Sequence, residues 1–147
     1  MISIRYLLAA LVLGVPAAAV AADAILVHRD PGCGCCGEWA EIVKAQFGRA
    51  VQIIDDANRP ALTKARGVPA DLASCHTAII DGMTFESHVP IADMKRALAQ
   101  RPKGVSGLAV AGMPLGSPGM EVPGRPAQAF EVVAFGPGGR RVFSRHR

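Results

Sequence analysis

Apolar and polar residues alternate in short blocks between residues 24 and 101, and each block is long enough for one strand or one helix. Ala24–His28 is a short apolar run of the kind that forms a buried strand. Residues 38–47 place Trp39, Ile42 and Phe47 at helical spacing. Asp81-Gly82 separates two strand-like runs, as in a hairpin. The pattern predicts strands at 24–28, 51–54, 77–80 and 83–86, and helices at 38–47, 59–66 and 90–100.

The order β-α-β-α-β-β-α is typical of an α/β, thioredoxin-like domain, and we expect that domain to span residues 23–101. Residues 102–126 differ, because they are dense in glycine and proline and contain Met113 and Met120. They indicate a long loop, which in a domain of this size is usually functional or disordered. Residues 129–135 and 141–144 resemble two strands joined by glycines and Pro137. We therefore expect a Gly/Pro/Met-rich C-terminal extension, residues 102–147, which ends in a β-hairpin and packs on the same domain.

Residues 1–22 have the pattern of a secretory signal peptide. Arg5 precedes an apolar run, Leu7–Ala22, that ends in small residues. The run of about 16 residues is shorter than the roughly 20 that a membrane-spanning helix needs. We therefore expect cleavage near Ala21 or Ala22, a periplasmic location and no membrane span after cleavage. In that oxidising compartment, exposed thiols form disulfides unless something holds them.

Composition argues against a nucleic-acid-binding function. The chain of 147 residues has a formal net charge of +4, and only 5% of its residues are aromatic. Because so few aromatic side chains are present for base stacking, we expect the arginines near the C-terminus to form a solvated edge and expect no nucleic-acid partner. The length corresponds to one domain. We expect a monomer.

Three of the four cysteines lie within the four residues Cys33-Gly34-Cys35-Cys36. Cys33 and Cys36 form a C-x-x-C pair between a predicted strand and a predicted helix, where redox dithiols are found. The third sulfur suits neither a clean thiol exchange nor a single tetrahedral zinc ion. Adjacent thiolates can instead bridge several soft ions, among which Cu(I) prefers thiolate and thioether ligands. A plain disulfide, a thiol–disulfide enzyme and a soft-metal site remain open, and the sequence favours the metal site.

Other potential ligands occur near the ends of the predicted strands. In a thioredoxin-like fold the segment entering the third strand lies against the C-x-x-C loop, so Cys75 is expected to complete a group of four sulfurs. Two histidines lie close to these strand ends in the sequence, and the two methionines in the glycine-rich loop lack the apolar stripe of core residues. The predicted metal residues are Cys33, Cys35, Cys36, Cys75, His76, His88, Met113 and Met120.

These motifs together resemble the CopG-type periplasmic copper-resistance proteins, a family long catalogued as a domain of unknown function. The likeness rests on Cys33–Cys36 with Trp39, Gly67-Val68-Pro69, residues 74–78, His88-Val89-Pro90 and residues 112–121. Three features depart from the family pattern: Ser87 stands where glycine is usual, Ala111 where proline is usual, and Met83-Thr84 where an aromatic or aliphatic pair usually follows the hairpin glycine.

The resemblance implies a thioredoxin-like domain whose extension helps to bind metal. It also implies a cluster of several copper ions bridged by the four cysteine sulfurs, and interconversion of Cu(I) and Cu(II) ahead of efflux. We therefore expect a periplasmic copper-binding protein for copper resistance, with periplasmic copper-efflux components as partners. Two alternatives stay open: a copper chaperone or buffer without turnover, and a thiol–disulfide oxidoreductase.

Overall fold

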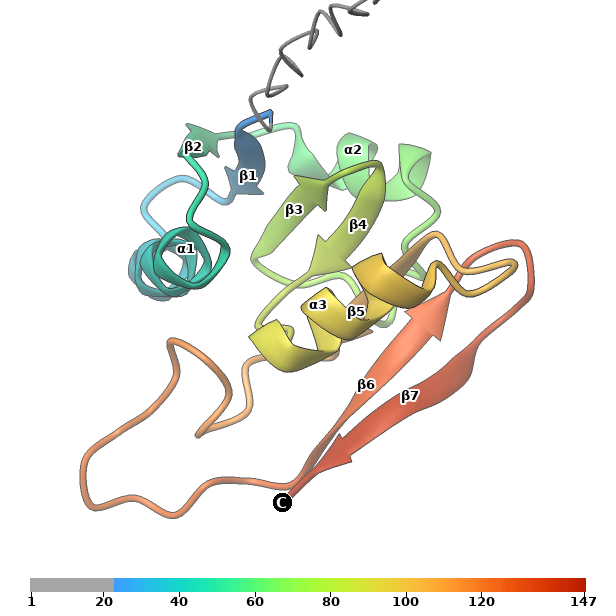
Figure 1. The fold of residues 1–147 in the computed structure, drawn as a ribbon. Helices are drawn as coiled ribbons and strands as arrows, with labels where there is room; N and C mark the ends of the chain where they lie inside the picture. The colour runs from blue at the N-terminus through green and yellow to red at the C-terminus, as the bar shows by residue number, and fades with distance from the viewer. Residues whose placement is uncertain (1–22) are drawn as a thin grey trace, which may run out of the picture.

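Seven strands form one mixed sheet in the order β2-β1-β3-β4-β5-β6-β7 (Figure 1). The computed structural model describes residues 23–147, and the predicted signal peptide, residues 1–22, lies outside them. The elements in chain order are β1 (Ile25–Arg29), α1 (Gly34–Phe47), β2 (Val51–Asp55), α2 (Arg59–Ala65), β3 (His76–Ile80), β4 (Met83–Glu86), α3 (Ile91–Gln100), β5 (Gly107–Val110), β6 (Phe130–Phe135) and β7 (Arg141–His146).

The strand directions divide the sheet into two parts. β1 runs parallel to β2 and antiparallel to β3, and β3 pairs antiparallel with β4. β5 then runs parallel to β4, and the β6–β7 hairpin extends the sheet beyond it. The predicted elements from β1 to α3 are present in the predicted order, with ends shifted by a few residues. The predicted C-terminal hairpin is also present.

Helix α1 begins at Gly34, whereas the sequence pattern predicted a start at residue 38. The extra turn contains Cys35 and Cys36, which the sequence placed in a loop because of the glycines on either side. The backbone N–H of Cys33 donates to the carbonyl of Asp30 and closes the turn that precedes the helix. The cysteine motif is therefore partly helical.

The segment 102–126, predicted as one long loop, contains the strand β5. All four of its residues are buried, and Leu108 and Val110 belong to the main core. A Cβ at Gly107 would collide with the backbone of Thr84 and the ring of Phe135, so only glycine allows this close strand pairing. The short apolar run between glycines and prolines gave too weak a periodic signal to be recognised as a strand.

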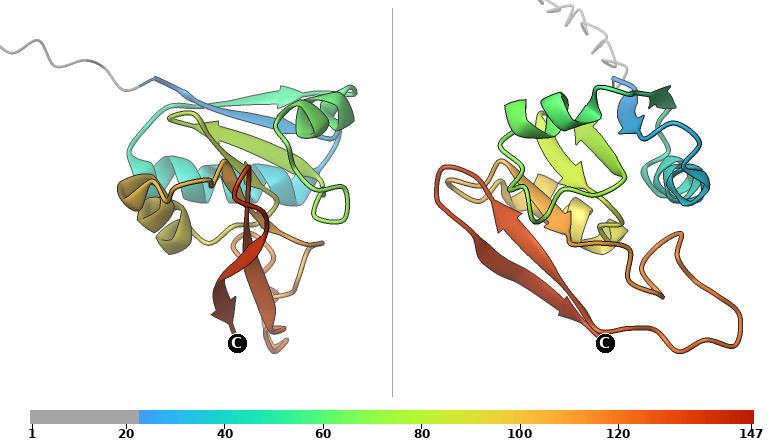
Figure 2. Two further views of the ribbon diagram at one scale, coloured as in Figure 1. Left: turned by 90° about the vertical axis from the view of Figure 1, so that its right-hand side faces the viewer. Right: turned by 180° about the vertical axis from the view of Figure 1, so that it is seen from behind.

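Helices α1 and α3 cover one face of the sheet, and α2 covers the other (Figure 2). Trp39 and Met94 are fully buried in the core between the first pair of helices and the strands. A smaller cluster around Leu72 and Phe135 packs on the opposite side. Alternate residues of β4 therefore face different environments: Phe85 points into the main core, and Glu86 points towards α2.

Within residues 23–147, no helix combines the length and the hydrophobicity that crossing a bilayer requires.

Candidate metal centre

The predicted cysteine and histidine ligands meet at one edge of the sheet because several strand ends lie together there. β1 ends beside the start of β3, since Arg29 pairs with His76 in the antiparallel register. The end of β4 lies next to them, since Glu86 pairs with Thr77. The loops that carry the C-x-C-C motif, Cys75 and His88 all leave or enter the sheet at this edge.

The four cysteine sulfurs all lie within 4.8 Å of one another. Cys33 and Cys36 form a disulfide, and Cys35 and Cys75 are free thiols. The sulfur of Cys35 lies 3.6 Å from that of Cys33. The structure thus brings together the four sulfurs expected from the sequence, and it does so in an oxidised state in which two of them are paired.

Two imidazoles flank the sulfur of Cys75. It lies 3.5 Å from Nδ1 of His76 and 3.8 Å from Nε2 of His88. The Nδ1 atom of His88 donates a hydrogen bond of 2.9 Å to the carbonyl of Pro118. Because a carbonyl can only accept, this bond fixes the tautomer of the neutral ring and leaves the Nε2 lone pair directed at the cysteine, as in histidines that bind metals.

Burial keeps both histidines neutral. Burial, with smaller contributions from His88 and Arg59, lowers the pKa of His76 to about 3. Burial also lowers the pKa of His88, against the opposing effects of the Pro118 carbonyl and Glu121. Nε2 of His76 is buried without a hydrogen-bond partner among the described residues. Neutral imidazole is the form that binds metal ions.

Burial, with a smaller contribution from the nearby Cys35, raises the pKa of the Cys75 thiol to about 11. At neutral pH the metal-free protein therefore holds Cys75 as a thiol. A thiophilic ion binds the thiolate, so its binding at this position releases a proton.

The two predicted methionines have different positions in the extension. The sulfur of Met113 lies 4.0 Å from the sulfur of Cys35, and its side chain is half exposed. Met120 is partly buried and closes a turn, in which its N–H donates to Ser117 and its carbonyl accepts from Gly116. The structure therefore places the Met113 side chain beside the cysteines. For Met120 it shows the backbone bonds of the turn.

The loop between the methionines is fixed against helix α1. Gly119 has a φ of +80°, and a Cβ there would lie 2.9 Å from the backbone nitrogen of Trp39. This contact requires glycine for both conformation and space. The loop path beside α1 is visible in Figure 1 as the orange segment that follows β5.

A network of charged side chains, which the sequence did not predict, lies next to the cysteine loops and is centred on Arg59. The guanidinium of Arg59 contacts both oxygens of Asp30, the carboxylate of Glu86 at 3.1 Å and the carbonyl of Ser74. Glu86 is fully buried and also accepts bonds from the backbone N–H of Ser74 and the hydroxyl of Thr77. No sequence signal identified these residues, because charged residues at a helix start and a strand end are usually exposed.

The network ties the two cysteine loops to each other. The backbone N–H of Asp30 donates to the carbonyl of Cys75, and the carbonyl of Asp30 accepts from the backbone N–H of Cys33. One guanidinium therefore connects the turn before the C-x-C-C motif, the residue before Cys75 and the end of β4. Burial is the main influence on the pKa of Glu86, and it raises that pKa.

Ser87, one of the departures from the family pattern, has a conformation that favours glycine. Its φ is +64°, and it is fully buried. Its hydroxyl donates a hydrogen bond of 2.8 Å to the carbonyl of Gly112, the residue before Met113. The serine therefore adopts a strained backbone next to His88 and gains a bond to the methionine loop.

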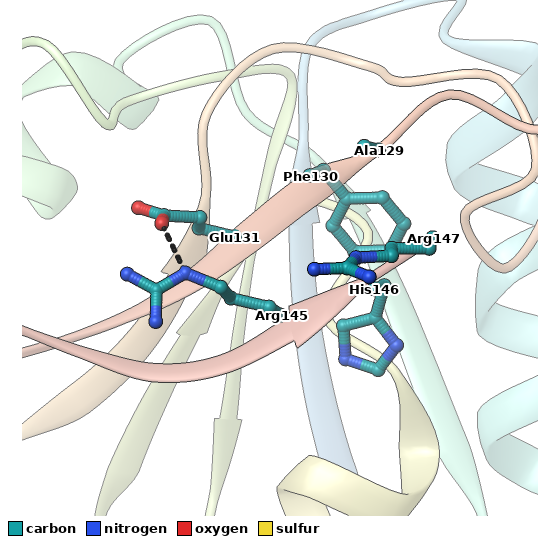
Figure 3. Close-up of a pocket in the computed structure, with 6 residues that line it drawn as sticks. All are labelled: Ala129, Phe130, Glu131, Arg145, His146 and Arg147. Atoms are coloured by element: carbon teal, nitrogen blue, oxygen red, sulfur yellow. Dashed lines mark hydrogen bonds and ion pairs between the residues drawn. The ribbon is translucent and has the colours of Figure 1, made fainter.

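A hollow of about 200 Å³, separate from the cysteine edge, lies on the C-terminal hairpin (Figure 3). Glu131 and Arg145 form an ion pair across it, and the ring of His146 stacks on Phe130. His146 also bonds Asp93 on α3. None of the six residues that line this hollow is a cysteine or a methionine, so the cysteine edge is the candidate for soft metal ions.

The fold and the site define a class: a mixed α/β protein whose sheet edge gathers four cysteine sulfurs, two neutral imidazoles and a thioether. Residues 72–120 match a family described as "Protein of unknown function, DUF411". A search among curated proteins finds no match.

Two solved structures of the copper resistance protein CopG resemble this chain. Form 1 is 40% identical, with a TM-score of 0.77, over 85% of this chain and 98% of that one. Form 2 is 38% identical, with a TM-score of 0.76, over 84% of this chain and 98% of that one. The chain belongs to the CopG copper-resistance protein family. The resemblance inferred from the motifs is thereby confirmed.

Proposed function

We propose that this protein binds copper in the periplasm and contributes to copper resistance by holding several copper ions in a cluster bridged by cysteine sulfurs. In this proposal the four cysteines bridge the ions, while His76, His88, Met113 and Met120 complete their coordination. Each ion would exchange one electron with an external partner as it changes between Cu(I) and Cu(II). Secretion after removal of residues 1–22, a monomeric state and efflux components as partners belong to the same proposal.

The observation that supports this function best is the spacing of the sulfurs. Four sulfurs within 4.8 Å of one another are too crowded for separate ions, and they suit shared ligands. The disulfide between Cys33 and Cys36 must be reduced before all four sulfurs can act as thiolates. A copper-related role is supported independently by the likeness to CopG.

Anaerobic titration of the fully reduced protein, residues 23–147, with Cu(I) tests the proposal. A cluster predicts saturation at more than one copper per chain, with sulfur-bridged copper distances visible in X-ray absorption. Saturation at a single copper would contradict the cluster. Controlled oxidation then separates the redox protein from the chaperone or buffer, because only the former changes oxidation state without losing its metal.

The thioredoxin-like class is part of the proposal, as is the division into a domain at 23–101 and an extension at 102–147. Support comes from the strand order β2-β1-β3-β4, with β3 antiparallel to β1, and from the helices on both faces. The C-x-x-C pair lies at the start of α1, as this class would require.

One observation favours a second candidate, a thiol–disulfide oxidoreductase. The disulfide between Cys33 and Cys36 lies at a helix N-terminus, where the macrodipole stabilises a thiolate. Reduction of insulin by the metal-free protein in the presence of a thiol reductant tests this candidate. Turnover that depends on Cys33 and persists in the C35S variant would support it, and no turnover above the background rate would exclude it.

A further inference from the structure

We infer that the protein keeps a smaller binding site for a soft monovalent metal ion when the Cys33–Cys36 disulfide is closed, and that this site is formed by Cys35, Cys75, His88 and Met113. The inference rests on the proposed copper function and adds a second metal-binding state to it. In this state the disulfide decreases the number of bound ions and leaves one of them in place.

The donors of this smaller site lie outside the disulfide. Cys35 and Cys75 are free thiols in the oxidised structure, and their sulfurs lie within 4.8 Å of each other. A thiolate–metal bond is about 2.3 Å long, so one ion between two sulfurs spans about 4.6 Å. The two free sulfurs can therefore bind one ion together with little movement of either loop.

His88 is already oriented towards this ion position. Its Nε2 atom lies 3.8 Å from the sulfur of Cys75, and its Nδ1 atom is held by the Pro118 carbonyl. A histidine whose far nitrogen donates to a carbonyl has the tautomer and orientation of a metal ligand. The disulfide changes neither contact, because both involve residues outside the C-x-C-C motif.

Met113 lies beside Cys35 and is the most exposed donor of the smaller site. Its sulfur lies 4.0 Å from the sulfur of Cys35, and half of its side chain is exposed. The loop that carries it is fixed by the hydroxyl of Ser87, which donates to the carbonyl of Gly112. The thioether is therefore placed at the solvent side, where an ion would enter or leave.

These donors select a class of ion. Two thiolates, a thioether and one neutral imidazole are soft or intermediate ligands, and they favour Cu(I) over the hard divalent cations. With the disulfide open, Cys33 and Cys36 add two thiolates and the capacity increases. With it closed, only the smaller donor set remains.

The two states are connected by ordinary thiol–disulfide exchange with a disulfide oxidant. One oxidised glutathione takes two electrons and two protons from the thiols of Cys33 and Cys36, forms their disulfide and leaves as two reduced glutathione molecules. Such oxidants act in the compartment where we expect the protein to work. The number of copper ions that the protein binds would then decrease as its surroundings become more oxidising towards thiols.

Anaerobic Cu(I) titration of two preparations of residues 23–147 tests the inference. One preparation is fully reduced, and the other is oxidised with glutathione disulfide and shown by thiol counting to retain two free thiols. Bathocuproine disulfonate serves as the competing chelator. The oxidised protein is expected to bind about one Cu(I) per chain, as one two-thiolate site allows. Binding of no copper, or of as many ions as the reduced protein binds, would overturn the inference.

Variants separate the smaller site from general loss of structure. In the oxidised state, C75S is expected to abolish competition with the chelator, and His88→Gln to weaken it by at least about tenfold. His146→Gln serves as the control, because His146 bonds Asp93 on α3, outside the site. The double variant C33S/C36S keeps the same smaller donor set without any oxidation. It should bind copper as the oxidised protein does, and failure to do so would contradict the assignment.

The experiment also distinguishes this inference from the proposed function. If the reduced protein binds several ions and the oxidised protein none, the cluster stands and the smaller site is wrong. If both preparations bind one ion, the cluster and the dependence of capacity on the disulfide are both wrong. If neither binds copper, the proposed function itself fails.

Discussion

The guanidinium of Arg59 lies 3.1 Å from the carboxylate of Glu86, and both side chains are almost completely removed from solvent. Neither residue is among the predicted metal ligands. The pair nevertheless positions them, because Arg59 also binds Asp30 and Ser74, which precede the two cysteine loops. The arrangement of the sulfurs at the sheet edge thus depends on an ion pair on the opposite face from Trp39.

Replacing Arg59 with methionine should strongly destabilise the protein, because it leaves the Glu86 carboxylate buried without its counter-charge. Loss of one partner of a buried pair costs about 3–5 kcal/mol of unfolding free energy. Urea denaturation of the metal-free protein measures the change. The matched control is Arg140→Met, since the ion pair of Arg140 with Asp71 is exposed and should contribute little. A small effect at Arg59 would show that Glu86 is satisfied by Ser74 and Thr77 alone.

The stability of the metal-free protein should decrease as the pH falls below about 6.5. His76 has its pKa lowered to about 3 by burial, so between these two pH values the unfolded chain binds a proton that the folded chain does not. The unfolded state gains this stabilisation, which amounts to a few kcal/mol. Thermal unfolding of His76→Asn and of the natural protein is measured between pH 7 and pH 4. The unfolding temperature of the variant should decrease less steeply as the pH falls. Equal slopes would contradict the assignment, because both proteins contain the same carboxylates.

Alkylation of Cys75 should continue to accelerate up to high pH. Burial raises its pKa to about 11, so only a small fraction is thiolate near neutral pH. Iodoacetamide labelling of the oxidised protein, followed by peptide mass spectrometry, resolves the rates of Cys75 and Cys35. The rate at Cys75 is expected to increase throughout the range from pH 7 to pH 10. A plateau near the pKa of an ordinary thiol would contradict this expectation.

Ser87 offers a test in which two small substitutions have different effects. Ser87→Ala loses the hydrogen bond to Gly112 and keeps a side chain at a φ of +64°, so it should destabilise the protein by about 1–2 kcal/mol. Ser87→Gly loses the same bond and removes the backbone strain, so its loss should be smaller. Chemical denaturation of both variants gives the comparison. If alanine is tolerated as well as glycine, the strain at this position is negligible.

Gly119→Ala should detach the methionine loop from helix α1. The new methyl group would lie 2.9 Å from the backbone of Trp39, at a residue with positive φ. Gly124→Ala is the matched control, because Gly124 has a similar φ of +76° and nothing within 4 Å of a Cβ. Gly119→Ala should be less stable than the control by about 1–3 kcal/mol, the cost of overpacking. Equal thermal stability of the two variants would show that the loop is not held there.

Most of the fold could be predicted from hydrophobic patterning, and the failures have physical causes. Trp39, Ile42 and Phe47 indicated α1 correctly, but the glycines beside Cys35 obscured its first turn. β5 was missed because a strand buried on both faces has no alternation, and four residues are too few to establish a period. Its partner strand β4 was found because Asp81-Gly82 marks the hairpin turn.

The candidate site was predictable for residues whose side chains carry distinctive chemistry. Three cysteines within one short motif indicate a metal or redox site, and the expected strand order predicted that Cys75 lies beside them. Arg59 gave no such signal, because its burial depends on contacts with Asp30 and Glu86 that only the folded sheet brings together. The likeness to CopG supports a copper-related role.

The spacing of the cysteines has a consequence for the order of folding. Cys33 and Cys36 are three positions apart, whereas Cys36 and Cys75 are separated by 39. Closing the short loop costs less chain entropy, so in an unfolded, oxidising chain the local disulfide forms first. The donors from β3, β4 and the extension join it only after the sheet has assembled. The local disulfide therefore shields two thiols from mispairing with Cys75 while the chain is still searching for its native contacts.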